Sequence, residues 1–116
     1  MAIDMRSWIP ERQAKILAGI IIAALTFSVF SPTLKNDFIG WDDDQYILES
    51  PYSGPLTPAL VREMFATSYF QSYTPLTLLA HAANVQLWGL DPRGHHLVNV
   101  LFHSMNAVLV FFIATS

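Results

Sequence analysis

Cysteine is absent from the sequence, which excludes disulfide-linked folds, thiolate metal sites and cysteine nucleophiles. Charge is also scarce: 13% of the residues are charged, against roughly 25% in an average soluble domain. The net charge of −3 and the pI near 5.7 argue against a nucleic-acid partner. The remainder is largely apolar, with 53% hydrophobic residues and a mean hydropathy of +0.37. This balance disfavours disorder and an ordinary soluble domain, and it predicts a protein whose partner is the lipid bilayer.

Two apolar segments are long enough to cross a bilayer, which takes about 20 mostly apolar residues. The first, Ile16–Leu34, carries no charge, and neither does the second, residues 96–116, when its histidines are neutral. A cleaved signal peptide ahead of a secreted soluble domain is the alternative for the first, but Ser28–Pro32 makes a poor cleavage site. The second reaches Ser116 without a basic flank, a glycine cap or a turn. We therefore expect the N-terminal piece of a longer polytopic protein.

The expected fold is an all-α membrane protein with two transmembrane helices joined by an outer loop that carries short interfacial helices. The expected order is a cytoplasmic tail (residues 1–15), a first span (16–34), the loop (35–95) and a second span (96–116). The tail holds three basic residues against two acids, and this excess favours a cytoplasmic N-terminus. The loop, with three basic residues against seven acids, then faces outward, which in a bacterium is the periplasm. Its runs from Pro58 to Phe70 and from Pro75 to Leu90 are short for a span and predict short helices.

The most informative stretch of the loop is the acidic cluster Asp42–Asp44, flanked by Phe38, Trp41 and Tyr46. Clustered carboxylates suit general-base catalysis or the binding of a hard divalent cation. The aromatic residues are candidate anchors at the bilayer interface. An acidic solvated turn is the simpler interpretation, and these residues alone favour it. The cluster does not match an EF-hand loop, which needs alternating acids, a central glycine and a distal glutamate.

A second constellation lies in the second span, where four polar residues recur at spacings of three, four and three: His96, Asn99, His103 and Asn106. This spacing places them on one stripe of an otherwise apolar helix. In a membrane such a stripe faces protein or a water-filled cavity. It indicates either a lining for a polar substrate or phosphate, or hydrogen bonds between helices, and the residues alone favour the second. A zinc site formed by His95, His96 and His103 is a weaker alternative, because adjacent histidines on a helix point apart.

Taken in order, two stretches resemble a known family. DFIGWDDDQYILESP, followed by YTPLTLLAHAANVQLWGLDPRGHHLVNVLFHSMNAVLVFF, is similar to the N-terminus of bacterial membrane proteins with tetratricopeptide repeats. These are related to the transmembrane-and-tetratricopeptide-repeat protein O-mannosyltransferases of the GT-C superfamily of polytopic glycosyltransferases. The resemblance covers about Asn36 to Phe112 and rests on W-D-D-D-x-Y, Y-x-P-L-T and G-x-x-P-x-G-H-H-L-x-N-x-x-x-H in that order.

The resemblance implies transfer of a sugar from a polyprenyl-phosphate donor to an acceptor hydroxyl at the outer membrane face. It implies that Asp42 and Asp43 are the catalytic pair, one of them acting as general base or helping to hold a divalent cation; whether a metal takes part stays open. Substrate-binding positions that shape the site near the donor phosphate would be Tyr73, Pro75, His95, His96 and Asn99, with Asp44, Arg93 and His103 as weaker candidates. Animal relatives tend to have arginine before the proline of the second motif, where this chain has Thr74.

Two spans cannot enclose a lipid-linked sugar and an acceptor, so we expect this N-terminal fragment to be inactive alone. Its expected partners are the bilayer, the lipid-linked sugar, and the remaining transmembrane helices of a parent protein or a partner subunit. The expected location is the bacterial inner membrane, as a multi-pass protein. The alternative function is a small non-enzymatic membrane protein that packs against partner helices.

Overall fold

The computed structural model describes residues 10–116 and is all-α there, without a β-strand in that range. In chain order the elements are α1 (Glu11–Phe30), the 3₁₀-helix η2 (Ser31–Lys35), the π-helix η3 (Asp44–Leu48), α2 (Pro58–Ala66), α3 (Pro75–Trp88) and α4 (Pro92–Ala114). The chain divides into two units. The membrane unit consists of two segments, the described residues up to Pro32 and Asn99–Ser116, and the loop unit consists of Thr33–Val98. The predicted all-α class is confirmed.

Two helical segments are long and apolar enough to cross a membrane, Glu11–Lys35 and Pro92–Ala114. Only 6% and 11% of the residues in their most apolar stretches are buried. The core helix of a soluble protein would be mostly buried, because exposed apolar surface is costly in water. A bilayer removes that cost, so the exposure favours a membrane protein with two spanning helices over a secreted soluble domain.

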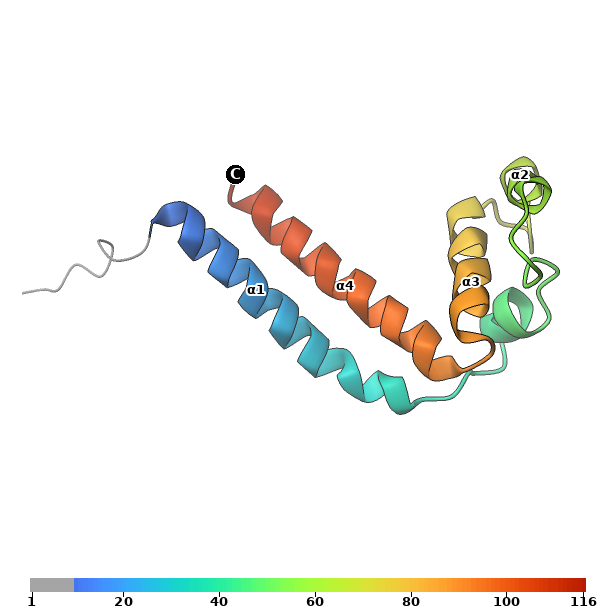
Figure 1. Ribbon diagram of the computed structural model, residues 1–116, viewed down its shortest axis with the longest axis horizontal. Helices are drawn as coiled ribbons and strands as arrows, with labels where there is room; N and C mark the ends of the chain where they lie inside the picture. Colours follow the sequence, from blue (N-terminus) through green and yellow to red (C-terminus); the bar gives the residue numbers. More distant parts are fainter. Residues whose placement is uncertain (1–9) are drawn as a thin grey trace, which may run out of the picture. The chain divides into compact units, whose positions relative to one another are not determined.

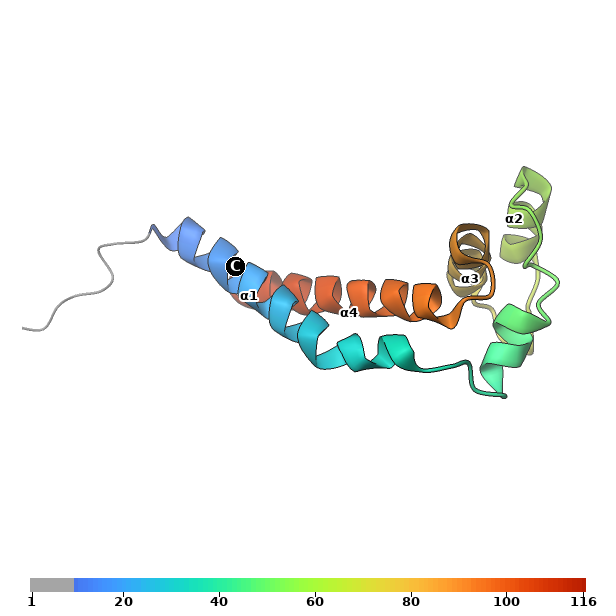
Figure 2. The same cartoon turned by 60° about the horizontal axis from the view of Figure 1, so that its bottom comes forward.

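Within the membrane unit, α1 and α4 run antiparallel (Figure 1). Near the chain's C-terminal end, the Lys15 ammonium donates to the main-chain carbonyl of Thr115 at 2.7 Å and pairs with Glu11 at 3.0 Å. Figure 2 shows the same pair turned by 60°. At the other end, the rings of Phe30 and His103 meet edge-on with centroids 4.6 Å apart. The lysine places a positive charge where the carbonyl end of α4 carries partial negative charge, which stabilises the helix end.

Both apolar helices begin earlier than the hydrophobic runs that predict them. Helix α1 starts at Glu11, because Glu11 and Lys15 form a favourable i,i+4 pair that extends the helix by a turn. Residues 1–9 of the expected cytoplasmic tail lie outside the described residues. Helix α4 starts at Pro92, where the backbone N–H of Arg93 donates to the Asp91 carboxylate at 3.0 Å. The stretch from Asp91 to Gly94, whose sequence is typical of a turn, is therefore the cap and first turn of α4.

The loop unit has its own small hydrophobic core, made where α2 and η3 pack against α3. Its buried residues are Tyr52, Met64, Leu78 and Ala82. Helix α2 is capped by the Thr57 hydroxyl, which accepts from the N–H of Leu60 at 3.2 Å. Thr74 occupies the same position before α3, where a threonine hydroxyl commonly caps a helix, but its hydroxyl makes no capping hydrogen bond.

Two glycines shape the join between α3 and α4. Gly89 ends α3 with a φ of 59°, a left-handed conformation that favours glycine. Gly94 lies in the first turn of α4, where an added Cβ would lie 2.2 Å from Cγ of Trp88. The absence of a side chain at Gly94 therefore allows the indole of Trp88 to lie directly on the helix.

Candidate functional site

The acidic cluster begins a short helical segment in the loop unit. Asp42 is exposed, whereas Asp43 and Asp44 are half-buried. Oδ2 of Asp43 accepts the backbone N–H of Ile39 at 2.9 Å, and Asp44 is the first residue of η3. The cluster is therefore more ordered than a solvated turn: the carboxylate of Asp42 is exposed, and that of Asp43 is held by the backbone N–H of Ile39.

The aromatic residues around the cluster separate into two groups. Phe38 packs edge-on against the imidazole of His95, with centroids 5.2 Å apart. Tyr46 meets Tyr69 edge-on at 5.5 Å and packs against the loop core. Trp41, by contrast, is 87% exposed. Of the three residues expected as interface anchors, only Trp41 presents its ring outward within the loop unit.

Two histidines of the loop unit, the buried His95 and the half-buried His81, lie near the acidic cluster. His95 is only 2% exposed, and its Nε2 hydrogen-bonds to the carbonyl of Gly89 at 2.9 Å. Burial lowers the pKa of His81 below its ordinary value of 6.5; the nearby His95 lowers it further, and the carboxylate of Asp43 partly offsets both effects. Asp43, His81 and His95 are therefore close enough to interact electrostatically.

His81 is the residue of this group that the sequence motifs did not identify. It lies in the middle of α3, within the run PLTLLAHAAN. A histidine inside a short apolar helix is a weak signal, because a satisfied core histidine produces the same pattern. The electrostatic influence of His95 on His81 depends on how α3 and the start of α4 fold together, which the chain spacing of these residues does not reveal.

The second motif, Y-x-P-L-T at residues 73–77, contains the start of α3. Pro75 is the first residue of the helix, where its missing N–H costs nothing. Tyr73 is exposed, but its hydroxyl donates to the carbonyl of Phe65 at 3.0 Å and so ties α3 to the end of α2. Both residues stabilise the local fold, whether or not either contacts a substrate.

The polar stripe on α4 extends across both units. His96 is half-buried in the loop unit and its ring lies 6.3 Å from that of Phe38. Asn99, His103 and Asn106 are exposed in the membrane unit. The described part of the chain thus leaves most of this polar stripe uncovered, whereas Ser104 on another face of α4 is buried.

Metal binding finds little support in residues 10–116. No group of three or more His, Asp or Glu side chains lies close enough there to hold a metal ion. The described residues therefore assemble neither the zinc site considered as an alternative nor a group of ligands for a divalent cation. Arg93, a weaker candidate for a phosphate contact, is exposed, and no ion pair involving it is found within the described range.

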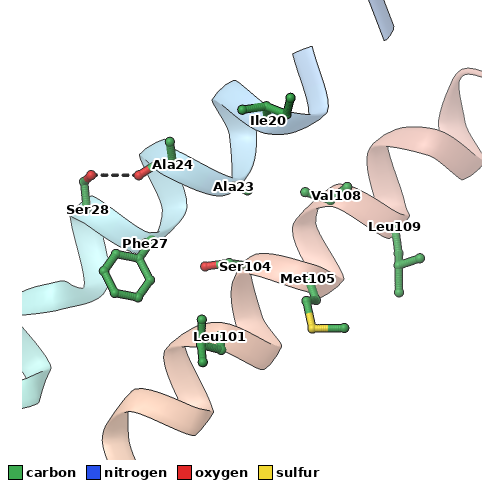
Figure 3. Close-up of a pocket in the computed structure, with 10 residues that line it drawn as sticks. All are labelled: Ile20, Ala23, Ala24, Phe27, Ser28, Leu101, Ser104, Met105, Val108 and Leu109. Carbon is green, nitrogen blue, oxygen red and sulfur yellow. Dashed lines mark hydrogen bonds between the residues drawn. The ribbon is translucent and has the colours of Figure 1, made fainter. Parts of the chain in front are cut away.

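An apolar groove lies between α1 and α4 in the membrane unit (Figure 3). Its volume is about 700 Å³, within the roughly 300–1,000 Å³ usual for ligand sites. Five residues of each helix line it: Ile20, Ala23, Ala24, Phe27 and Ser28, and Leu101, Ser104, Met105, Val108 and Leu109. The small side chains of Ala23, Ala24 and Ser28 on α1 make room for the groove. Its lining is apolar apart from the hydroxyls of Ser28 and Ser104, so the groove suits an aliphatic chain.

Curated relatives of the chain are protein O-mannosyl-transferases. The chain is 33% identical over 109 residues to Tmtc1 of Drosophila melanogaster, a match covering 86% of this chain and 13% of that protein. It is 33% identical over 97 residues to tmtc2 of Xenopus laevis, covering 77% of this chain and 12% of the relative. It is 27% identical over 108 residues to TMTC3 of Homo sapiens, a match covering 84% of this chain and 11% of that protein.

The chain thus spans only about an eighth of the length of these relatives. The match to the fly protein covers so much of the chain that it necessarily includes the acidic cluster and the paired histidines. No protein-family model matches the chain. No solved structure matches it either.

Proposed function

From its homology to protein O-mannosyl-transferases, we propose that the chain is the acid-bearing part of a membrane glycosyltransferase. The reaction is transfer of a sugar from a polyprenyl-phosphate donor to an acceptor hydroxyl. The observation that supports it best is the fly relative's match across the acidic loop and the histidine motif. The GT-C architecture, the tetratricopeptide repeats and the lipid-linked donor are part of this proposal.

Asp43 is the better placed of the two candidate bases. Its Oδ2 accepts the N–H of Ile39, which restricts the carboxylate, whereas Asp42 is exposed. In the proposed step the carboxylate takes the proton of the acceptor hydroxyl as that oxygen bonds to the anomeric carbon. The bond from the anomeric carbon to the phosphate oxygen breaks, and polyprenyl phosphate leaves with the electron pair. Asp42 lacks such a contact among the hydrogen bonds of the described residues, so we assign it a supporting role.

The groove between α1 and α4 is the proposed seat of the donor's polyprenyl chain. An isoprenoid is entirely apolar, and a groove between membrane helices accepts it without exposing hydrocarbon to water. Tyr73, Pro75, His95, His96 and Asn99 remain the proposed binding positions, with Asp44, Arg93 and His103 as secondary candidates.

The proposed location is the inner membrane of a bacterium, with the N-terminus in the cytoplasm and the loop in the periplasm. The basic residues ahead of the first span support this orientation. Further transmembrane helices complete the site, and the exposed Asn99, His103 and Asn106 support their presence, because polar groups in a bilayer normally face protein or water.

The test is transfer of mannose from polyprenyl-phosphate mannose in membranes that contain the chain together with the rest of its transferase. Asp43→Asn should lower the transfer rate by at least 100-fold, in the range typical of a lost general base. Asp37→Asn, an exposed carboxylate of the same loop, is the matched control and should leave the rate unchanged. Full activity after replacement of both Asp42 and Asp43 would remove the catalytic assignment.

The second candidate function is a non-enzymatic helix-packing partner. The same uncovered stripe on α4 favours it, since interhelical hydrogen bonds would satisfy those side chains. This function predicts that the 116-residue chain forms a defined complex. Replacing Asn99 and Asn106 by leucine should abolish the complex, whereas Asp43→Asn should leave it unchanged. That combination of results would support helix packing over sugar transfer.

A further inference from the structure

A second cavity of the membrane unit lies where α1 begins and α4 ends, two points that lie at the same end of the helix pair (Figure 1). This cleft has a volume of about 670 Å³. It is lined by Glu11, Arg12, Lys15 and Ile16 of α1 and by Phe112 of α4. It shares no lining residue with the apolar groove between the same helices, so it is a separate cavity whose walls combine charged and apolar side chains.

The lining of the cleft changes from charged to apolar at the edge of the hydrocarbon region. Residues 16–34 carry no charge, so Ile16 is the first residue of α1 that we expect within the hydrocarbon. Arg12 lies one helical turn earlier, a distance of about 6 Å along the axis. The polar layer on each side of a bilayer is roughly 5–8 Å thick. Arg12 and Lys15 therefore lie at the level of the lipid head groups, and Ile16 lies beside the start of the acyl chains.

Lys15 is held at the cleft by two hydrogen-bond acceptors. Its ammonium donates to the main-chain carbonyl of Thr115 at 2.7 Å and pairs with Glu11 at 3.0 Å. An ammonium has three N–H donors, so one is left for a further acceptor. Glu11 is the one acid among the lining residues, and its contact with Lys15 already pairs it.

Arg12 adds a second positive charge, and no carboxylate of residues 10–116 pairs with it. It is exposed and lies three residues before Lys15, which places both on the same face of α1. Two basic residues and one acid leave the cleft with one net positive charge. A guanidinium binds a phosphate through two parallel hydrogen bonds. The cleft thus offers cations at the depth of lipid phosphates and apolar side chains at the depth of acyl chains.

We propose that this cleft binds an anionic phospholipid. The lipid phosphate accepts hydrogen bonds from Arg12 and Lys15, and the first part of an acyl chain lies against Ile16 and Phe112. The net positive charge of the cleft favours a head group with a net negative charge, such as phosphatidylglycerol, over the zwitterionic phosphatidylcholine. Because Lys15 also holds the end of α4, the bound lipid links the two helices. This site is independent of sugar transfer and of the acidic loop.

Native mass spectrometry of the whole chain, released from detergent with added lipid, counts bound lipids directly and needs no enzymatic activity. Dioleoylphosphatidylglycerol should form a complex with a single lipid and bind about fivefold more tightly than dioleoylphosphatidylcholine, as expected for one charge near the head groups. Glycerol phosphate has the same phosphate without acyl chains and should not be retained.

Matched variants locate the binding site. Arg12→Gln should weaken binding of phosphatidylglycerol about fivefold. Lys35→Gln removes a positive charge from the other end of the apolar segment Glu11–Lys35 and should leave binding unchanged. Lys15→Gln should weaken binding but also loses the contact with Thr115, so it is compared with Lys15→Arg, which keeps the charge and should keep the lipid.

Three results would overturn the proposal. Equal binding of phosphatidylglycerol and phosphatidylcholine would mean that the cleft does not recognise the charge of the head group. Retention of glycerol phosphate would establish a site for soluble phosphates instead of a lipid. Equal losses from Arg12→Gln and Lys35→Gln would show that the lipid is attracted by any basic residue near the membrane and not by this cleft.

Discussion

At the scale of single residues, Gly94 determines whether α3 and α4 can join as they do. Any Cβ at this position would lie 2.2–2.6 Å from atoms of Trp88, far inside contact distance. Gly94→Ala should therefore displace the indole and lower the free energy of unfolding by about 1–3 kcal/mol, as overpacking does. Chemical denaturation in detergent, followed by tryptophan fluorescence, measures this change.

Gly54→Ala is the control for that substitution. Gly54 also lies in the loop unit, but an added Cβ there meets nothing within 4 Å. It should leave stability unchanged or raise it by a few tenths of a kcal/mol, because alanine restricts the unfolded chain. Equal losses from both substitutions would show that the close approach of Trp88 is not what makes Gly94 necessary.

His81 gives the loop unit a pH-dependent stability. Burial lowers the pKa of His81 in the folded chain, so the unfolded chain takes up the proton first as pH falls below 6.5. The free energy of unfolding should then fall by at most about 1.4 kcal/mol per pH unit, until the folded-state pKa is reached. Above the ordinary pKa this contribution to stability is fully present.

Denaturation at several pH values between about 7.5 and 5.5, where only histidine among unperturbed side chains titrates, measures the effect. His81→Asn cannot take up the proton, so its stability should depend less steeply on pH than that of the unchanged chain. Identical slopes for the two proteins would contradict the burial of a neutral imidazole at this position.

At the scale of elements, Gly19 controls how closely α1 and α4 approach. It is buried, and a Cβ there would lie 3.2 Å from the ring of Phe112. Alanine needs a shift of a few tenths of an ångström, which the ring can make, whereas leucine needs the helices to separate. Gly19→Leu should widen the pair and relax the contact between Lys15 and Thr115, while Gly19→Ala should do so only slightly.

The chain lacks cysteine, so spin labels can be placed on introduced cysteines at the exposed Ile16 and Ile113 without other changes. Pulsed electron spin resonance then reports the separation of the helices. Ala14→Leu, on an exposed position of α1, is the control and should leave the distance distribution unchanged.

The elements themselves follow largely from local sequence rules. The apolar runs predict both long helices, and the shorter runs that begin at Pro58 and Pro75 predict the two short helices that the structure confirms. The errors lie at boundaries, where a side-chain pair such as Glu11–Lys15 extends a helix beyond its apolar run. The site depends on contacts between elements, and no periodicity reports that Phe38 covers His95 or that His81 approaches Asp43.

At the scale of the whole molecule, the proposed chemistry depends on which side of the membrane the loop occupies. A lipid-linked sugar at the outer face can reach Asp43 only if the loop unit is there. The expected topology places the loop outside and both chain ends inside, because three basic residues precede the first span. Single cysteines introduced at Ser68 in the loop and at Ser116 report the two sides, since both positions are exposed and the chain has no other thiol.

In intact bacterial cells, a membrane-impermeant maleimide should label the cysteine at position 68 and spare the one at position 116. Permeabilised cells should allow both to react, which shows that neither thiol is hidden by folding. The reverse pattern in intact cells would place Asp42 and Asp43 in the cytoplasm, where an outward-facing lipid-linked sugar is out of reach. Labelling of both in intact cells would mean that α1 and α4 do not both cross the bilayer, and the apolar surface that they expose would then need a different partner.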